Sequence, residues 1–201
     1  FGQTETTVIV GTLEGTSVRI GSMGKANPQY DVDIVDPDGN SVPDGENGEI
    51  VIRTDKGAPC GLLKEYYRAP DKTAETWHDG MYHTGDVAWR DEDGYFWYVG
   101  RIGDVIKSSG YRIGPFEIES VIMELPYVLE CGVSAAPDPV RGQVVKASIV
   151  LTKGTEGTEE LKKEIQAYVK EHTAPYKYPR IVVFMDALPK TTSGKIQRSK
   201  L

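Results

Sequence analysis

The sequence predicts an α+β protein, with a small β-rich, barrel-like part followed by a C-terminal α/β lobe. In the first half, short apolar runs are separated by clusters of Pro, Asp and Gly, which is typical of strands joined by tight turns. In the second half, runs with the apolar spacing of helices alternate with strand-like runs. The composition changes near residues 100–110, where glycine and basic residues gather. We therefore place a boundary there and expect domains at 1–101 and 102–201.

The predicted strands of the first part are short and lie next to strong turn signals. Pro37-Asp38-Gly39 follows one alternating run, and Asp44-Gly45 precedes another. Strands of this kind form a small barrel or sandwich most simply. We expect strands at Val32–Val35, Glu49–Arg53 and Tyr95–Val99, and one or two helical turns at Asp71–Trp77.

The second part contains two predicted amphipathic helices. Apolar residues recur with helical spacing from Pro115 to Leu125, and the proline stands at the start, where a helix tolerates it. Thr158 is a suitable N-cap for another helix that runs to about Glu171. Strands are expected at Gly132–Ala135, Val144–Leu151 and Arg180–Phe184.

Composition and charge argue against several classes of function. Hydrophobic residues make up 39% and charged residues 26% of the 201 residues, which is ordinary for a folded globular protein. The net charge of −7 argues against nucleic acid as a partner, and no apolar run is long enough to span a membrane. Cys60 and Cys131 have no metal-ligand spacing, so we expect free thiols and a cytoplasmic location. Because the chain starts at Phe1 rather than Met, we also expect a piece of a longer protein.

One region is basic within this acidic chain. From Lys162 to Lys200, nine Lys or Arg residues stand against three acidic residues. Such a surface is either simply solvated or suited to phosphate groups, and composition alone does not separate the two interpretations.

A lysine-bearing loop near the end of the chain invites comparison with a phosphate-binding P-loop, but the comparison fails. The P-loop requires Gly where Pro189 stands, and Ser or Thr where Ile196 stands. What remains is a loop of small residues, 191–194, that presents Lys195. A lysine in such a place is usually just exposed, although its ammonium can also act as a mobile charge for a phosphate.

Two further motifs are equally weak when each is taken alone. Asp86 follows what we interpret as a tight Thr84-Gly85 turn, and its carboxylate is either a surface acid or an acceptor for the two hydroxyls of a ribose. Gly100-Arg101 and residues 107–114 form a glycine-rich, basic linker. This linker is either a plain interdomain loop or a segment built for large backbone rotation.

Five motifs taken together, in this order and spacing, resemble the motif series of the adenylate-forming superfamily. That superfamily includes acyl-CoA synthetases, luciferases and the adenylation domains of nonribosomal peptide synthetases. The motifs, which cover essentially the whole chain, are FGQTET at 1–6, GEIVI at 48–52, YHTGD at 82–86, the stretch from GR to EIE at 100–119, and PKTTSGKIQR at 189–198. SSGYRIGP at 108–115, PDPVRG at 137–142 and TAPYKYPR at 173–180 are similar to the acetyl-CoA and medium-chain acyl-CoA synthetase branch, with the medium-chain group most similar.

The resemblance implies an enzyme that makes acyl-CoA from a small carboxylic acid, ATP and coenzyme A. In this family the carboxylate attacks the α-phosphorus of ATP, giving acyl-AMP and pyrophosphate, and the thiol of coenzyme A then displaces AMP. The small lobe turns between these half-reactions, so the resemblance implies that it is mobile. Mg²⁺ is the implied metal and fatty acid metabolism the implied setting. The acyl chain and the oligomeric state are left open.

The motif match also implies roles for single residues. Lys195 is the implied catalytic residue, which contacts the substrate carboxylate and the α-phosphate of ATP. Glu5 is the implied magnesium-associated acid, since Mg²⁺ prefers oxygen ligands. Asp86 and Arg101 are implied to hold the ribose. The whole implied nucleotide site consists of Gly2, Gln3, Thr4, Asp86, Arg101, Arg112 and Lys195.

Coenzyme A is implied to meet another face of the lobe. Ser109-Gly110-Tyr111 resembles the segment that lines the pantetheine tunnel, and Arg141 and Lys170 resemble residues near the nucleotide phosphates of coenzyme A. The family usually has Asp at the hinge, where this chain has Gly103. Glycine allows the rotation but offers no carboxylate to hold either pose.

Two alternatives to an acyl-CoA synthetase are considered. One is an adenylate-forming enzyme with another acceptor, either a carrier-protein thiol or oxygen, and the detail at 108–115 and 137–142 weighs against it. The other is a non-catalytic nucleotide- or coenzyme A-binding module, and the retention of Asp86, Arg101 and Lys195 weighs against it. In the family the phosphate loop and most of the acyl pocket precede the first motif, so we expect this chain alone not to turn over.

Overall fold

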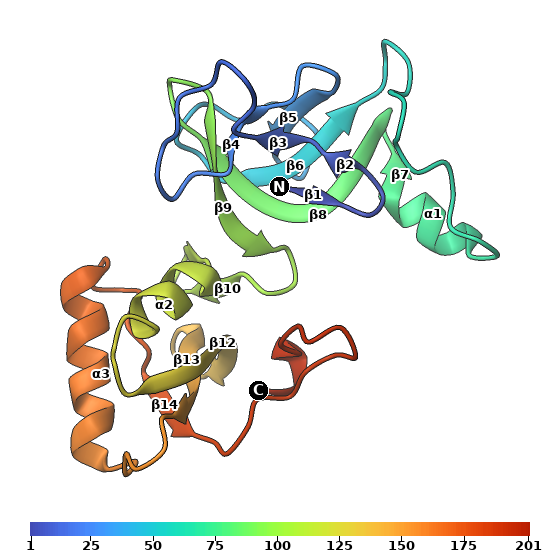
Figure 1. The fold of residues 1–201 in the computed structure, drawn as a ribbon. Coiled ribbons are helices and arrows are strands. Elements are labelled where there is room, and N and C mark those ends of the chain that lie inside the picture. Colours follow the sequence, from blue (N-terminus) through green and yellow to red (C-terminus); the bar gives the residue numbers. More distant parts are fainter. The chain divides into compact units, whose positions relative to one another are not determined.

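The computed structural model describes residues 1–201, which divide into two compact units, Phe1–Ile102 and Gly103–Leu201 (Figure 1). The predicted α+β class is confirmed, because strands predominate and helices are few. The predicted division after Arg101 lies one residue before the boundary between the units. None of the helices combines the length and the apolar character that a membrane crossing requires.

A curled sheet of seven strands forms the frame of the first unit (Figure 1). Its strand order is β3-β4-β9-β8-β6-β5, and β7 pairs with β8. A separate antiparallel pair, β1 with β2, lies at the start of the chain. The elements are β1 (Gly2–Gln3), β2 (Thr7–Val8), β3 (Val10–Gly11), β4 (Gly24–Ala26), β5 (Asp31–Val35), β6 (Gly48–Arg53), α1 (Pro70–Thr76), β7 (Trp77–His78), β8 (Met81–Arg90) and β9 (Tyr95–Arg101).

Strand β6 is buried on both faces, which explains its continuous apolar run. Ile50 and Ile52 belong to the main core of this unit, and Val51 joins a smaller cluster with Val35 and Met81. Successive side chains of a strand point to opposite faces, so the two clusters lie on the two sides of the sheet. Gly48 opens the strand because a Cβ there would lie 2.5 Å from the carbonyl oxygen of Val35. The glycine of the second motif therefore serves strand packing.

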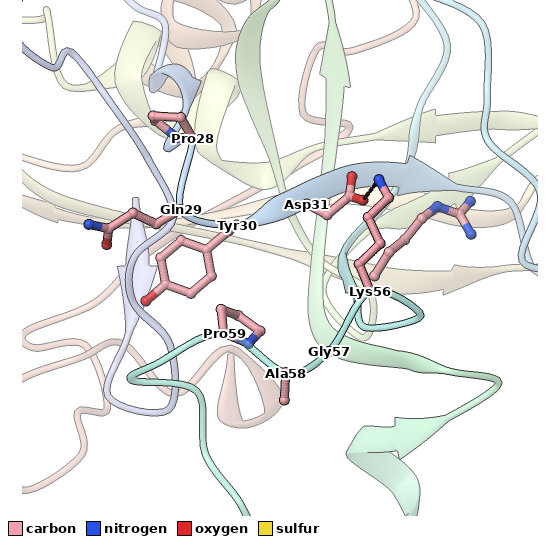
Figure 2. Close-up of a pocket in the computed structure, with 9 residues that line it drawn as sticks. Pro28, Gln29, Tyr30, Asp31, Lys56, Gly57, Ala58 and Pro59 are labelled. Carbon is pink, nitrogen blue, oxygen red and sulfur yellow. Dashed lines mark hydrogen bonds and ion pairs between the residues drawn. The ribbon is translucent and has the colours of Figure 1, made fainter.

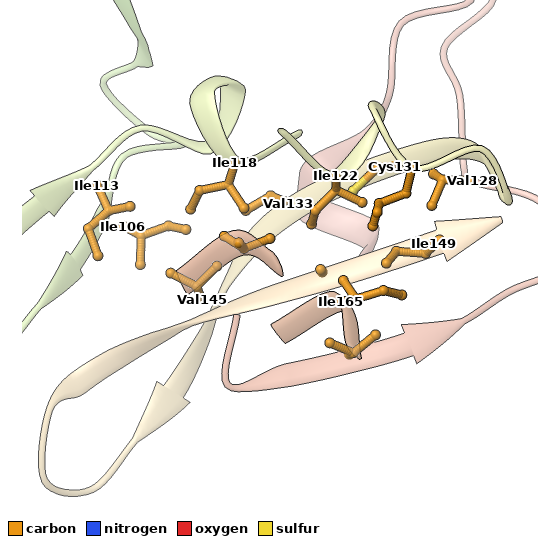
Figure 3. Packing of buried hydrophobic residues seen from close by; sticks show 14 residues of the cluster. Ile106, Ile113, Ile118, Ile122, Val128, Cys131, Val133, Val145, Ile149 and Ile165 are labelled. Carbon is orange, nitrogen blue, oxygen red and sulfur yellow. The ribbon is translucent and has the colours of Figure 1, made fainter. Parts of the chain in front are cut away.

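The second unit has a five-stranded sheet with the order β11-β10-β13-β12, and β14 pairs with β13 in parallel. Both α-helices and the sheet share one core, in which Ile118, Ile122 and Ile165 pack against Val145 and Ile149 (Figure 3). The elements are β10 (Ile106–Ser108), β11 (Tyr111–Ile113), α2 (Pro115–Ile122), β12 (Val128–Asp138), β13 (Gly142–Leu151), α3 (Glu159–His172), β14 (Ile181–Phe184) and the 3₁₀ helix η1 (Arg198–Lys200).

The predicted helices both exist, with one corrected end. Thr158 caps α3 as predicted, because its hydroxyl accepts a hydrogen bond of 3.1 Å from the amide of Leu161. Helix α2 ends at Ile122 instead of Leu125. Leu125 precedes Pro126, whose ring disfavours helical backbone at the residue before it. Leu125 is nevertheless buried, so the apolar spacing identified a core residue beyond the helix.

Two predicted loops are strands. The tight Thr84-Gly85 turn is wrong, since both residues lie inside β8, where the pairing with β9 shifts register between Val87 and Ala88. Gly85 has a φ of +71°, so glycine supplies a left-handed backbone conformation inside a strand, and the same residue type also signals turns. The proposed linker at 107–114 folds mainly into the β10–β11 hairpin, which is part of the second sheet.

Candidate functional site

Asp86 lies at the centre of a buried polar group in the first unit. The antiparallel register of β8 and β9 pairs it with Arg101, whose Nε lies 3.6 Å from its Oδ1. Only 3% of Asp86 is exposed. Its Oδ1 accepts a hydrogen bond from the hydroxyl of Tyr98 (2.9 Å), and its Oδ2 accepts one from Nε2 of Gln3 (2.6 Å). The structure thus joins three predicted site residues, Gln3, Asp86 and Arg101.

Burial and the neighbouring side chains have opposite effects on the pKa of Asp86. Burial raises the pKa of Asp86 above the ordinary range, and the Arg101 guanidinium and the hydrogen bonds from Tyr98 and Gln3 oppose that rise. Each carboxylate oxygen has a second lone pair, so the group still has capacity to accept hydrogen bonds from two neighbouring hydroxyls. A carboxylate held in this way, with an exposed guanidinium beside it, is suited to a diol such as ribose.

The first motif is held against this group by its glutamine. The Gln3 amide also donates to the carbonyl oxygen of Thr84 (2.8 Å), and its Oε1 accepts from the hydroxyl of Tyr82 (3.1 Å). Burial raises the pKa of Tyr82 far above its usual value, so this hydroxyl stays a donor. Gly2 is required by the backbone, because a Cβ there would lie 1.9 Å from the carbonyl oxygen of Thr7.

The other two residues of this motif are less enclosed. Thr4 is exposed, and Glu5 accepts a hydrogen bond of 3.0 Å from the hydroxyl of Tyr66. No group of three or more His, Cys, Asp or Glu side chains is placed to hold a metal ion. Glu5 thus belongs to no cluster that could enclose a metal ion, and it suits Mg²⁺ only where nucleotide phosphates and water supply the other ligands. Its role toward a metal stays a prediction.

In the second unit, Lys195 stands on a loop that is closed on itself. Lys190 and Ile196 form an isolated β-bridge, and the Thr191 amide donates to the carbonyl oxygen of Lys195 (2.8 Å). The Lys195 amide in turn donates to the Thr191 hydroxyl (3.1 Å), and Gly194 takes a φ of +83°. The side chain of Lys195 is exposed, and its ammonium makes neither a hydrogen bond nor an ion pair.

Four residues predicted to meet coenzyme A lie together at the β10–β11 turn. The Ser109 amide donates to the carbonyl oxygen of Arg141 (3.1 Å), and Nη1 of Arg141 donates to the Ser109 hydroxyl (3.2 Å). Ser109 and Gly110 form the turn with φ values of +48° and +86°. Tyr111 follows and stacks on Tyr176, with ring centroids 4.0 Å apart. The contact with Arg141 joins two motifs far apart in the sequence.

Three predicted residues stand apart from these groups within their own unit. Arg112 is exposed on β11, opposite Lys107. Lys170 is exposed on α3, with its ammonium 5.9 Å from the ring centroid of Tyr178. Gly103 is the exposed first residue of the second unit.

Sequence reasoning missed the tyrosines that support these groups. Tyr98 bonds Asp86, Tyr82 bonds Gln3, Tyr66 bonds Glu5 and Tyr176 stacks on Tyr111. In the sequence, an aromatic residue of this kind cannot be told from an ordinary core residue, because its hydrogen-bond and stacking partners are defined only by the fold. The one available signal was that Tyr98 lies in the predicted strand Tyr95–Val99, three residues before Arg101.

The first unit also has an open pocket of about 570 Å³, which holds none of the predicted site residues (Figure 2). Pro28, Tyr30 and Pro59 form part of its lining, and Lys56, which also lines it, is paired with Asp31 at 2.8 Å. Arg53, also in the lining, is paired with Asp33 at 2.8 Å. Both cations in the lining are therefore paired with carboxylates.

Comparison with known proteins places these groups in context. Residues 1–67 match the family described as AMP-binding enzyme, and residues 117–195 match the AMP-binding enzyme C-terminal domain. The whole chain is 51% identical to acyl-coenzyme A synthetase ACSM3, mitochondrial, of Mus musculus, and 53% identical to acyl-coenzyme A synthetase ACSM5, mitochondrial, of Homo sapiens. The chain spans 35% of the length of each of these relatives.

Solved structures give the same assignment for the fold. An anthranilate CoA ligase bound to anthranoyl-AMP matches 99% of the chain at 36% identity, with a TM-score of 0.87, and the match covers 38% of that protein. ATP-bound MatB from Rhodopseudomonas palustris matches 99% of the chain at 31% identity, with a TM-score of 0.82, and also 38% of that protein.

The expected cytoplasmic location is wrong by this comparison, because the synthetases ACSM3 and ACSM5 are mitochondrial proteins. Free thiols indicated only a reducing environment, and composition carries no further information about the compartment.

Proposed function

Since the chain belongs to the AMP-binding, adenylate-forming enzyme family, we propose that it is part of an AMP-forming acyl-CoA synthetase of the medium-chain type. The observation that carries the proposal is that Asp86 accepts a hydrogen bond from Gln3 and forms an ion pair with Arg101, so the three residues form one polar group. These residues come from three motifs separated along the chain, and together they suit a ribose. Identity of about half to acyl-CoA synthetases over the whole chain supports the choice of branch. We also propose a mitochondrial location.

In the first half-reaction the difficulty is charge, because a carboxylate must attack the α-phosphorus of a polyanion. Positioned cations and hydrogen-bond donors offset that repulsion. We assign this work to the free ammonium of Lys195 and to the hydroxyl of Thr4, which is exposed and open to a phosphate oxygen. Attack forms the bond between carboxylate oxygen and phosphorus, and pyrophosphate leaves. Asp86 and Arg101 hold the ribose, with Gly2, Gln3 and Arg112 completing the nucleotide contacts.

Mg²⁺ is proposed as the ion that accompanies ATP, with Glu5 as its ligand from this chain. The single carboxylate fits, since Mg²⁺ in nucleotide sites is usually held by one or two carboxylates together with phosphates and water. When bound, the ion neutralises phosphate charge. The Tyr66 hydroxyl at 3.0 Å keeps the Glu5 carboxylate in one orientation.

In the second half-reaction, coenzyme A is proposed to meet the β10–β11 turn. The backbone of Ser109 and Gly110 and the ring of Tyr111 line the path of the pantetheine chain. Arg141, fixed by its bonds to Ser109, and Lys170 face the phosphates of the nucleotide end. The thiol sulfur attacks the acyl carbonyl, the bond to the phosphate oxygen breaks, and AMP leaves.

The same small lobe is proposed to turn about Gly103 between these steps. Glycine has no Cβ and therefore tolerates a wider range of backbone conformations than other residues, which suits a position of rotation. Without a hinge carboxylate, the lobe is held less firmly in each pose. The chain alone is proposed not to turn over, because it spans only 35% of the length of the synthetases ACSM3 and ACSM5.

The test uses a full-length protein that carries this sequence. It is supplied with ATP, Mg²⁺, coenzyme A and a series of acids from acetate to decanoate, with benzoate added, while AMP and acyl-CoA are followed together. Coupled formation of both products, with an optimum at medium chain length, is the expected result. The Lys195→Ala variant is the matched control for background hydrolysis of ATP.

Other outcomes separate the alternatives. Acyl-AMP without acyl-CoA would keep the adenylation chemistry and move the acceptor to a carrier-protein thiol or oxygen. No product with any acid, while nucleotide still binds, would favour a non-catalytic module.

A further inference from the structure

The segment that carries Lys195 is anchored on its C-terminal side by an arginine three residues further on. Arg198 lies in η1, and its guanidinium makes three hydrogen bonds to Glu119. Nε donates to Oε1 at 3.1 Å, and Nη2 donates to Oε1 at 2.9 Å and to Oε2 at 2.7 Å. The Arg198 and Glu119 side chains are 24% and 11% exposed, so the pair is largely shielded from water. A guanidinium that bonds both oxygens of a carboxylate fixes the orientation of the two side chains as well as the distance between them.

Glu119 connects this anchor to the core of the second unit. It lies in α2, between the fully buried Ile118 and Ile122. Its Oε1 also accepts a hydrogen bond of 2.8 Å from the amide of Val133 in β12. One buried carboxylate therefore joins the helix, the strand and the C-terminal segment. A buried carboxylate needs such partners to offset its lost hydration.

Arg198 also reaches the residue that follows the proposed hinge. Its Nη1 lies 3.4 Å from Oδ2 of Asp104, and Asp104 directly follows Gly103. Packing also holds this segment. Leu201 lies so close to Gly132 that a Cβ on the glycine would be 2.7 Å from the leucine side chain. The base of the lysine loop is thus fixed by charge and by packing, while Lys195 itself is exposed.

We propose that Arg198 is the positioning residue for Lys195, and that it couples the lysine loop to the residue after the hinge. The inference rests on the proposed function of Lys195. Because the loop is closed by the bonds between Thr191 and Lys195, it moves about its base as one body. The position of the Lys195 backbone, from which the ammonium extends, is therefore set where the segment is anchored. Loss of the anchor slows the step that uses Lys195 and leaves the coenzyme A step intact.

The experiment separates the two half-reactions in the full-length protein. Acyl-AMP formation is followed by pyrophosphate release, and thioester formation is followed with supplied acyl-AMP and coenzyme A. Arg198→Met is expected to slow acyl-AMP formation by about 10- to 100-fold, the range that small misplacements of a reacting group cause. Thioester formation from supplied acyl-AMP is expected to stay at the wild-type rate. Arg198→Lys keeps the charge without the fork, so its adenylation rate is expected to lie between the two.

Two further variants serve as controls for this experiment. Lys200→Met removes a cation from the same short helix, where Lys200 is exposed and makes no side-chain bond, and is expected to leave both steps unchanged. Asp104→Asn weakens only the contact next to the hinge and is expected to slow adenylation less than Arg198→Met. If Arg198→Met does not fold, Arg198→Lys and Asp104→Asn decide the question in the same way.

The outcomes that overturn the proposal are distinct from those that overturn the function. Equal slowing of both half-reactions by the Arg198 variants would mean that the residue only stabilises the fold. Wild-type adenylation in those variants, with Lys195→Ala inactive, would also overturn the positioning role while the proposed function stands. A wild-type protein that forms no acyl-AMP would instead contradict the proposed function.

Discussion

The two units hold their principal charged side chains in opposite ways. Asp86 in the first unit is buried, and Gln3, Tyr98 and Arg101 contact its carboxylate. Lys195 in the second unit is exposed, and its ammonium has no partner within the chain. The difference matches the proposed roles, because Asp86, proposed to hold the ribose, is built into a sheet, whereas Lys195, proposed to act in one half-reaction, stands on a loop. It also separates the expected effects of mutation on stability from those on chemistry.

The largest expected effect on chemistry comes from the free lysine. Lys195→Ala is expected to lower the rate of acyl-AMP formation in the full-length protein by about 100- to 1000-fold, as removal of one preorganised charge-stabilising group does in other enzymes. Its melting temperature is expected to be unchanged, because the ammonium bonds nothing in the folded chain. Pyrophosphate release and thermal unfolding measure the two quantities.

Lys195→Arg is the control that keeps the positive charge but changes the shape of the group that carries it. An arginine keeps a cation but spreads it over a planar fork, so recovery is expected to be partial. A fall in melting temperature with Lys195→Ala would break the comparison, because it would show that the lysine contributes to the fold.

The buried carboxylate is expected to show the reverse pattern. Asp86→Asn keeps the shape but turns one acceptor into a donor, so either the Gln3 amide or the Tyr98 hydroxyl loses its acceptor. A buried donor without a partner is expected to lower the free energy of unfolding by about 1–3 kcal/mol. The KM for ATP is expected to rise because the ribose contact is weakened. Urea unfolding and ATP titration test both effects.

Glu92→Gln is a matched control for this variant, since Glu92 is an exposed acid in the same unit and makes no side-chain bond. It is expected to change neither quantity. An unchanged free energy of unfolding in Asp86→Asn would mean that the hydrogen bonds to the Asp86 carboxylate do not stabilise the fold.

The same comparison explains what the sequence could predict. The loop that presents Lys195 could be predicted because its small residues and its proline lie within a few positions, but the loop alone suggested only an exposed lysine, and the motif resemblance supplied the role. The partnership of Asp86 with Arg101 depends on strand register across β8 and β9, and motif matching supplied the two names without the contact. Tyr98 was missed because its role exists only once that register is formed. The turn predicted at Gly85 was wrong because a left-handed glycine inside a strand has the same signature as a tight turn.

The smallest expected effect concerns Gly103, which stands between the two regions in the chain. Gly103→Asp adds a carboxylate at the proposed hinge. No atom lies within 4 Å of the Cβ position, and the backbone there is not left-handed, so the free energy of unfolding is expected to change little. If the carboxylate holds the lobe in each pose, the rates of the two half-reactions should change by a few-fold, because the equilibrium between the poses changes.

Gly103→Ala is the matched variant, since it restricts the backbone in the same way without adding a charge. If the Asp and Ala variants have equal half-reaction rates, any effect comes from backbone freedom and not from the carboxylate. If both variants have the wild-type rates, Gly103 has no role in the proposed alternation between the lysine and coenzyme A steps.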